Sequence, residues 1–218
     1  MIETIIHFSK MSGGLLPAMG LLLLITLTVI VERLYFYHRI LKSGDALEHD
    51  LQKVEYQSVN QLRELESHYA DTLQSSLITS ALSSRRDNPE AMDRQLEESI
   101  MWQLPKIDKS IWVLDTSVTL APLMGLLGTI IGMVHAFDVL GTTGSTENTT
   151  KMVTGGIAEA LVATGAGLLI AIVAVLFLNH FNKRTRLAMH QMDLIKTMLL
   201  NRFLVAVQKN PNPDLICF

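Results

Sequence analysis

Residues 157–181 decide the fold, and they read IAEALVATGAGLLIAIVAVLFLNHF. Glu159 is the single charged residue in this stretch, which exceeds the roughly 20 residues that a helix needs to cross the hydrocarbon core of a bilayer. Residues 13–31 (GGLLPAMGLLLLITLTVIV) and 113–137 have the same character, with Asp115 as the one charged residue of the latter. The sequence therefore predicts an all-α membrane protein with three transmembrane helices.

The composition agrees with a membrane protein because the apolar residues are concentrated in these stretches. Of 218 residues, 49% are hydrophobic and 18% are charged, and the mean hydropathy is +0.30. The first stretch ends at Glu32 and Arg33. A signal peptide has a shorter apolar core and a small-residue cleavage site, so we expect an uncleaved anchor. A single cysteine, Cys217, excludes a disulfide within the chain, and the net charge of −3 argues against nucleic acid as a partner.

The distribution of Lys and Arg predicts the orientation, because positively charged loops stay on the cytoplasmic side of a membrane. Residues 32–112 carry ten Lys and Arg and residues 182–218 carry six, whereas residues 1–12 and 138–156 carry one each. We therefore expect residues 1–12 and 138–156 in the periplasm. Residues 32–112 and 182–218 are expected in the cytoplasm.

The long segment 32–112 is expected to be folded and helical. Apolar residues recur at three- and four-residue steps over residues 45–82, which indicates one amphipathic helix or two that break near Asn60. Asn88 and Pro89 have the positions of an N-cap and a first helical residue. The helix that they begin is expected to lead straight into the second span.

Helical structure is also expected next to the last two spans. Pro105 shortly precedes the second span and predicts a kink there. After residue 181 the helical spacing of apolar residues continues until Asn210 and Pro211 stop it. The third span should therefore run on into the cytoplasm as one long helix.

Glu159 is the residue most informative about function. A charged side chain within a span costs at least a few kcal/mol when it faces lipid, so the Glu159 carboxyl group must face protein or water. Its neighbours from Gly155 to Gly167 are mostly small, which lets helices approach closely. We interpret Glu159 as a group that takes up a proton on an interior helix. The alternative is a structural Glu that hydrogen-bonds to a neighbouring helix.

Two threonines are candidates to share a polar zone with Glu159. Counted inward at 1.5 Å per residue, from residue 137 on the second span and from Gly155 ahead of the third, Glu159 lies about 6 Å deep, Thr129 about 12 Å and Thr164 about 14 Å. The alternative for each threonine is a hydrogen bond to a carbonyl of its own helix. Asp115 lies near the inner end of the second span, where it either marks a cytoplasmic exit for ions or pairs with Lys109.

Small residues predict where the second and third spans pack against each other. Gly128 and Gly132 form a GxxxG face. His135 and His180 lie at span ends and are interpreted as interfacial residues rather than ligands. The sequence has no HExxH or GxSxG motif, so we expect no enzyme, no catalytic residues, no metal site and no cofactor. The candidate packing residues are Gly125, Gly128, Gly132, Gly165 and Gly167.

The runs APLMGLLGTIIGM at residues 121–133 and GIAEALVAT at residues 156–164 resemble the two signature helices of the ExbB/TolQ branch of the ExbB/TolQ/MotA proton-channel family. The resemblance covers essentially the whole chain. It implies a multi-pass protein of the bacterial inner membrane, in which a pentamer of this chain surrounds a dimer of a single-span ExbD- or TolR-like partner. In that family a membrane Asp of the partner carries the proton. The resemblance further implies that Glu159, Thr129 and Thr164 line the inner cavity.

The resemblance implies a subunit of a motor that the proton motive force drives. We favour an ExbB-like function, in which the motor energises TonB-dependent outer-membrane transport through a TonB-like transducer. The alternative is a TolQ-like subunit that acts on a TolA-like transducer in the Tol-Pal envelope system. His135-Ala136-Phe137 is TolQ-like, and Val173 stands where the family usually has a Pro. An alternative of another class is a membrane scaffold that binds partners and conducts no ions.

Overall fold

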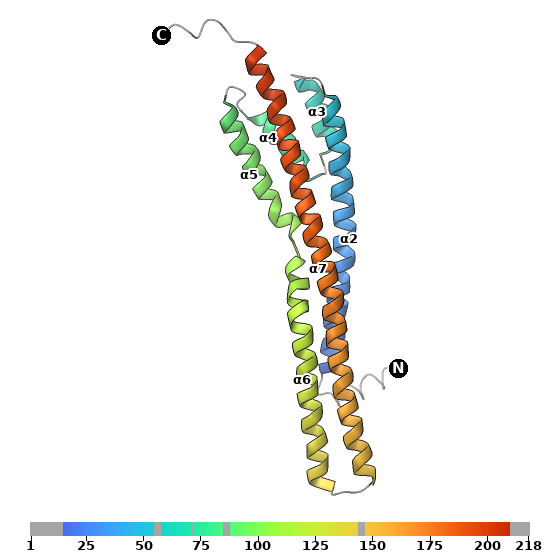
Figure 1. The fold of residues 1–218 in the computed structure, drawn as a ribbon. Coiled ribbons are helices and arrows are strands. Elements are labelled where there is room, and N and C mark those ends of the chain that lie inside the picture. Colours follow the sequence, from blue (N-terminus) through green and yellow to red (C-terminus); the bar gives the residue numbers. More distant parts are fainter. Residues whose placement is uncertain (1–14, 55–57, 71, 85–87, 144–146, 210–218) are drawn as a thin grey trace. The chain divides into compact units, whose positions relative to one another are not determined.

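The computed structural model describes residues 15–54, 58–70, 72–84, 88–143 and 147–209, and its regular structure over these residues is α-helical (Figure 1). The all-α prediction is confirmed for this part of the chain. The helices are α2 (Leu15–Lys53), α3 (Val59–His68), α4 (Ser75–Ser83), α5 (Pro89–Ile107), α6 (Ile111–Thr143) and α7 (Glu147–Lys209).

The predicted number of transmembrane helices is confirmed as three helices that are long and apolar enough to cross a membrane. These candidate spans are Leu15–Lys53, Ile111–Val139 and Thr150–Arg202. Each extends beyond the apolar stretch that predicted it. The reason is that an α-helix satisfies its own backbone hydrogen bonds, so it continues where the side chains become polar.

The chain divides into two compact units. The membrane unit comprises Met1–Arg33 and Ser110–Phe181, and the polar unit comprises Leu34–Lys109 and Asn182–Phe218. In the membrane unit, α6 and the first half of α7 run side by side with opposite chain directions (Figure 1). The start of α2 packs onto this pair. A buried apolar cluster at this contact consists of Leu15, Met19, Ala121, Ile170 and Ala171.

The polar unit contains more helices than the sequence predicts. Residues 45–82 fall in the end of α2, in α3 and in α4. Helix α3 begins after Ser58, whose hydroxyl accepts a hydrogen bond from the Gln61 N–H at 3.4 Å. The break near Asn60 that the sequence suggested therefore lies just before Val59, where Ser58 caps the new helix.

The start of α5 is as the sequence predicts, but its end differs. Asn88 caps the helix by accepting a hydrogen bond from the Ala91 N–H at 3.1 Å, and Pro89 follows it. The expectation that this helix leads straight into the second span is wrong, because α5 ends at Ile107 and Ser110 has a φ of 66° before α6 begins. A left-handed residue of this kind interrupts a right-handed helix.

The polar unit has a core of its own, to which α2, α4, α5 and α7 all contribute. The Tyr37 side chain is buried in it and its hydroxyl donates to the Ile107 carbonyl at 3.0 Å. The hydroxyls of Tyr37 and Thr185 lie 2.7 Å apart. Fully buried apolar residues of this core include Leu47, Leu51, Leu77, Ile78, Leu96 and Ile195.

Candidate functional site

Glycines let the backbones of α6 and α7 touch in the membrane unit. A methyl group placed on Gly167 would stand 2.5 Å from the Ala121 carbonyl oxygen, and one placed on Gly125 would stand 3.0 Å from the Thr164 Cα. Real Cβ atoms essentially never come within 3.0 Å of another heavy atom. A side chain at position 167 would therefore force the helices apart, and one at position 125 would require the neighbouring backbone to shift by a few tenths of an ångström.

The other candidate packing glycines differ among themselves. A methyl group on Gly128 would stand 2.9 Å from the Ala163 Cβ, and one on Gly132 would stand 2.7 Å from the Ala160 Cβ. At Gly165 an added methyl group would meet nothing within 4 Å. Gly128 and Gly132 thus lie at the α6–α7 contact together with Gly125 and Gly167, whereas Gly165 faces away from it.

The two candidate threonines have different roles in this contact. The Thr164 hydroxyl of α7 donates a hydrogen bond to the Gly125 carbonyl of α6 at 2.8 Å, so it ties the two helices together. The Thr129 hydroxyl donates to the Leu126 carbonyl of its own helix at 2.7 Å. Thr129 therefore adopts the alternative that is common for membrane threonines.

Glu159 lines a cavity of about 470 Å³ in the membrane unit. Helix α7 contributes Glu159 and the small residues around it, α6 contributes Gly128 to Val139, and Leu15 and Leu16 come from the start of α2. The Oε1 atom of Glu159 is buried, and none of the described residues gives it a hydrogen bond. A buried carboxylate without a partner is costly. This oxygen therefore needs a partner such as water, for which the cavity offers room.

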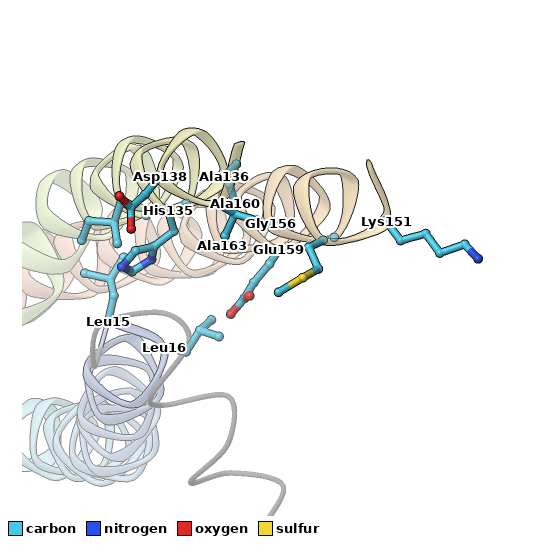
Figure 2. A pocket seen from close by; sticks show the side chains of 16 residues that line it. Leu15, Leu16, His135, Ala136, Asp138, Lys151, Gly156, Glu159, Ala160 and Ala163 are labelled. Atoms are coloured by element: carbon cyan, nitrogen blue, oxygen red, sulfur yellow. The ribbon is translucent and has the colours of Figure 1, made fainter. Parts of the chain in front are cut away.

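His135 of α6 lies in the same cavity. Figure 2 shows that the His135 imidazole and the Glu159 carboxyl group both project from their helices toward the start of α2, where Leu15 and Leu16 lie. Lys151 also lines the cavity, but its side chain extends away from Glu159 in this view. Asp138 of α6 lines the cavity as well, beside His135 in this view, so an imidazole and two carboxyl groups share the cavity with Lys151.

The sequence contained a signal that His135 and Glu159 share a cavity, and the interpretation of His135 as an interfacial residue did not use it. His135 lies two residues before the end of the stretch 113–137, and Glu159 lies two residues after the start of the stretch 157–181. Because the two helices run in opposite directions, equal distances from these ends place both residues near the same end of the α6–α7 pair. In the structure they lie about one helical turn apart, since Gly156 lies against Ala136 and Gly132 lies against Ala160.

Asp115 lies far along α6 from this cavity. It precedes His135 by 20 residues of continuous helix, which corresponds to about 30 Å. Its side chain is exposed, so it is open to solvent or lipid headgroups. Asp115 and Glu159 thus occupy different regions of the membrane unit.

The chain is similar in sequence to known membrane transport proteins. Residues 63–194 match the MotA/TolQ/ExbB proton channel family, and the matched segment contains Glu159, Thr129 and Thr164. A biopolymer transport protein of Synechocystis, ExbB-like 3, is 34% identical over 78% of this chain and 82% of its own length. The ExbB protein of Neisseria gonorrhoeae is 36% identical over 45% of this chain and 44% of its own length.

A relative from the other branch is equally similar. The Tol-Pal system protein TolQ of Haemophilus influenzae is 38% identical over 43% of this chain and 37% of its own length. The family match covers more than half of the 218 residues, and the Synechocystis relative is matched over most of its length. The chain therefore belongs to the MotA/TolQ/ExbB proton channel family.

Proposed function

We propose that this chain is an ExbB-like stator subunit of a motor in the bacterial inner membrane that the proton motive force drives. The observation that supports the proposal most directly is the buried Oε1 of Glu159, which faces a cavity and has no hydrogen-bond partner among the described residues. A side chain with a purely structural role would be satisfied by the neighbouring helix. We therefore assign to Glu159 the uptake and release of a proton, or the binding of the water that carries it.

The proposed assembly is a pentamer of this chain around a dimer of an ExbD- or TolR-like single-span protein. The large exposed apolar side chains of α6 and α7, such as Leu123 and Leu169, are 61% exposed each and support contacts with lipid or with further protein. Each proton that crosses a potential of 100 mV supplies about 2.3 kcal/mol, which the motor passes to a TonB-like transducer.

The decisive experiment replaces Glu159 by Gln and by Asp in a strain that lacks the native gene. The neutral amide keeps the shape of the side chain but cannot ionise, so Glu159→Gln should abolish energised uptake while the protein is still expressed and still retains its single-span partner in a pull-down. Glu159→Asp should retain part of the activity. Full uptake by Glu159→Gln would reject the ionisable role, and loss of the partner would make Glu159 structural. A non-conducting scaffold would tolerate the amide.

The same assay ranks the remaining candidate residues. Thr129→Ala and Thr164→Ala should impair uptake less than Glu159→Gln, because each removes one hydroxyl that water can replace. Asp115→Asn should have the smallest effect, because its carboxyl group lies outside the cavity and is exposed. An uptake defect for Asp115→Asn as large as that for Glu159→Gln would instead assign Asp115 to the ion path.

A TolQ-like role is the second candidate, and His135 favours it because His135-Ala136-Phe137 is the TolQ-like run of this chain. The two roles are separated by complementation in strains that lack either exbB or tolQ. Rescue of TonB-dependent uptake supports the ExbB-like role, whereas rescue of outer-membrane integrity without uptake supports the TolQ-like role.

The proposed orientation has the N-terminus in the periplasm and residues 182–218 in the cytoplasm. Its test uses a chain in which Cys217 is replaced by Ala, so that a single new cysteine reports on its own position. A cysteine at Thr146 should react with a membrane-impermeant reagent from the periplasm, and a matched cysteine at Ser67 should react from the cytoplasm only. The reverse pattern would overturn the topology.

A further inference from the structure

The exposed face of α5 changes from charged to apolar along the helix. Its first half exposes Glu90, Arg94 and Glu97. Its second half exposes apolar side chains, among them Trp102, which is 71% exposed, and Met101, which is 63% exposed. These apolar residues, which we name the α5 patch, are Met101, Trp102, Leu104 and Pro105.

The α5 patch is additional to the core contact of the same helix. The opposite face of α5 is buried in the polar unit through Leu96, Ile100 and Ile107. The Trp102 indole N–H donates only a long hydrogen bond of 3.4 Å to Glu98 on its own helix. Helix α5 has therefore completed its packing within the unit, and the α5 patch remains available for a contact outside it.

The chain enters a candidate span directly after the α5 patch. Helix α5 ends at Ile107, and the span that starts at Ile111 is apolar enough to cross a membrane. Five helical residues and the short connection allow at most about 22 Å between Trp102 and Ile111. The span is 29 residues long, about 43 Å, which exceeds the ~30 Å hydrocarbon core and reaches into the headgroup region.

A second exposed aromatic residue shows the same relation to a span. Tyr35 is 72% exposed and follows Arg33, the last residue of the first segment of the membrane unit. Trp and Tyr are enriched where a membrane meets water, because their rings are apolar at one end and carry a hydrogen-bonding group at the other. The described aromatic residues that the polar unit exposes, Tyr35 and Trp102, thus both lie close in sequence to a span.

We propose that the α5 patch lies in the headgroup region of the bilayer that α6 enters, with Trp102 as its interfacial anchor. The α5 patch thus contacts lipid rather than another protein. The charges beside the α5 patch balance, because Lys106 and Lys109 are matched by Glu98 and Asp108. Binding therefore rests on the apolar and aromatic side chains and does not require anionic lipid. Zwitterionic phosphatidylcholine should suffice, and added salt should have little effect.

The two tryptophans of the chain allow a direct test with the full-length protein in phosphatidylcholine vesicles. Trp112→Phe leaves Trp102 as the only indole. Its emission should be shifted to the blue relative to an indole in water and should be quenched by lipids brominated on their acyl chains. Bromine near the headgroup should quench it more strongly than bromine near the chain ends. The matched variant Trp102→Phe leaves Trp112, which is 69% exposed at the start of α6, as the reference for an indole at the interface.

Three outcomes would overturn the proposal. Emission of a water-exposed indole without quenching would show that the α5 patch faces solvent. Blue-shifted emission that brominated lipid does not quench would show that protein covers the α5 patch, such as a second copy of this chain. Quenching that appears only with anionic lipid and disappears with salt would also contradict it, because it would assign the contact to Lys106 and Lys109.

Discussion

Thr26 of α2 and Ser117 of α6 join two helices of the membrane unit through a hydrogen bond of 3.0 Å between their hydroxyls. Both side chains are fully buried. The Ser117 hydroxyl donates to the Val113 carbonyl at 2.7 Å, so its oxygen accepts from Thr26. A hydroxyl has one proton, and Thr26 must share it between Ser117 and the Leu22 carbonyl, which lies at 2.7 Å.

Thr26→Val should lower the thermal stability of the detergent-solubilised protein. Val keeps the shape of the side chain but loses the donor to Ser117, at a cost of about 1 kcal/mol. The control is Thr28→Val, since Thr28 is exposed and its hydroxyl bonds to Leu24 of its own helix. We expect a decrease in Tm for Thr26→Val and almost none for Thr28→Val. Equal values for the two variants would show that the α2–α6 hydrogen bond does not contribute.

Gly167→Ala should destabilise the membrane unit far more than Gly165→Ala. The new methyl group at position 167 would stand 2.5 Å from the Ala121 carbonyl oxygen, whereas at position 165 it would meet nothing within 4 Å. Backbone atoms cannot turn aside as the end of a flexible side chain can. Expression level and thermal unfolding of the two variants measure the difference. Gly165→Ala should even be neutral or slightly stabilising, because Ala favours a helix over Gly by about 1 kcal/mol.

His135→Asn should change the pH dependence of proton-driven activity while leaving the protein assembled. The imidazole shares the cavity of Glu159, and histidine side chains serve as proton shuttles in proteins, a role that an amide cannot take. His180→Asn is the matched control on the other span, at its opposite end. The measurement is activity against external pH for the three proteins. A profile for His135→Asn that superimposes on that of the native protein would remove His135 from the proton path.

Tyr69 should ionise at a higher pH than an ordinary tyrosine, and its ionisation should lower the stability of the polar unit. Burial and the hydrogen bond that its hydroxyl donates to Asp50 at 2.8 Å raise the pKa of Tyr69 from about 10 to about 12. Because this pKa is raised, its contribution to stability is complete below about pH 10 and is lost as the pH rises through 12. The tyrosinate absorbance that appears near pH 12 should be missing in Tyr69→Phe.

The Asp50 carboxyl group, which accepts the hydrogen bond from Tyr69, gives a second test of the same interaction. The hydrogen bond from Tyr69 is the main cause that lowers the pKa of Asp50, followed by the one from Lys53. Its contribution to stability is therefore present above the usual carboxyl pKa and is lost as the pH falls through the lowered value. Asp50→Asn should bring the Tyr69 transition part of the way back toward pH 10, since burial remains. An unchanged transition would show that Asp50 does not act on Tyr69.

The sequence could predict the membrane helices because length and hydropathy are sufficient to identify a span. It could also predict that the Glu159 carboxyl group is sheltered, since the energy of a charge in lipid does not depend on the details of packing, and the structure buries its Oε1 atom. The end of α5 could not be predicted from the sequence. The helix ends at Ile107, whose carbonyl accepts a hydrogen bond from Tyr37, 70 residues earlier in the chain, and no local sequence pattern marks the left-handed backbone at Ser110.

The roles of the two threonines could not be predicted for a different reason. Thr129 and Thr164 are equally plausible members of a polar zone by depth, but successive helical residues are rotated by about 100°, so small differences in packing decide what a hydroxyl meets. Thr164 meets the carbonyl of Gly125 across the contact, and Thr129 turns back to its own helix.

The glycine contact also limits which parts of the membrane unit can move during a working cycle. Sliding α6 along α7 would drive the methyl groups of Ala160 and Ala163 out of the notches at Gly132 and Gly128, and it would break the hydrogen bond from Thr164 to Gly125. The two helices are therefore expected to move together as one rigid body at this contact. A change in the width of the Glu159 cavity would therefore have to come from its remaining described wall, which Leu15 and Leu16 of α2 form.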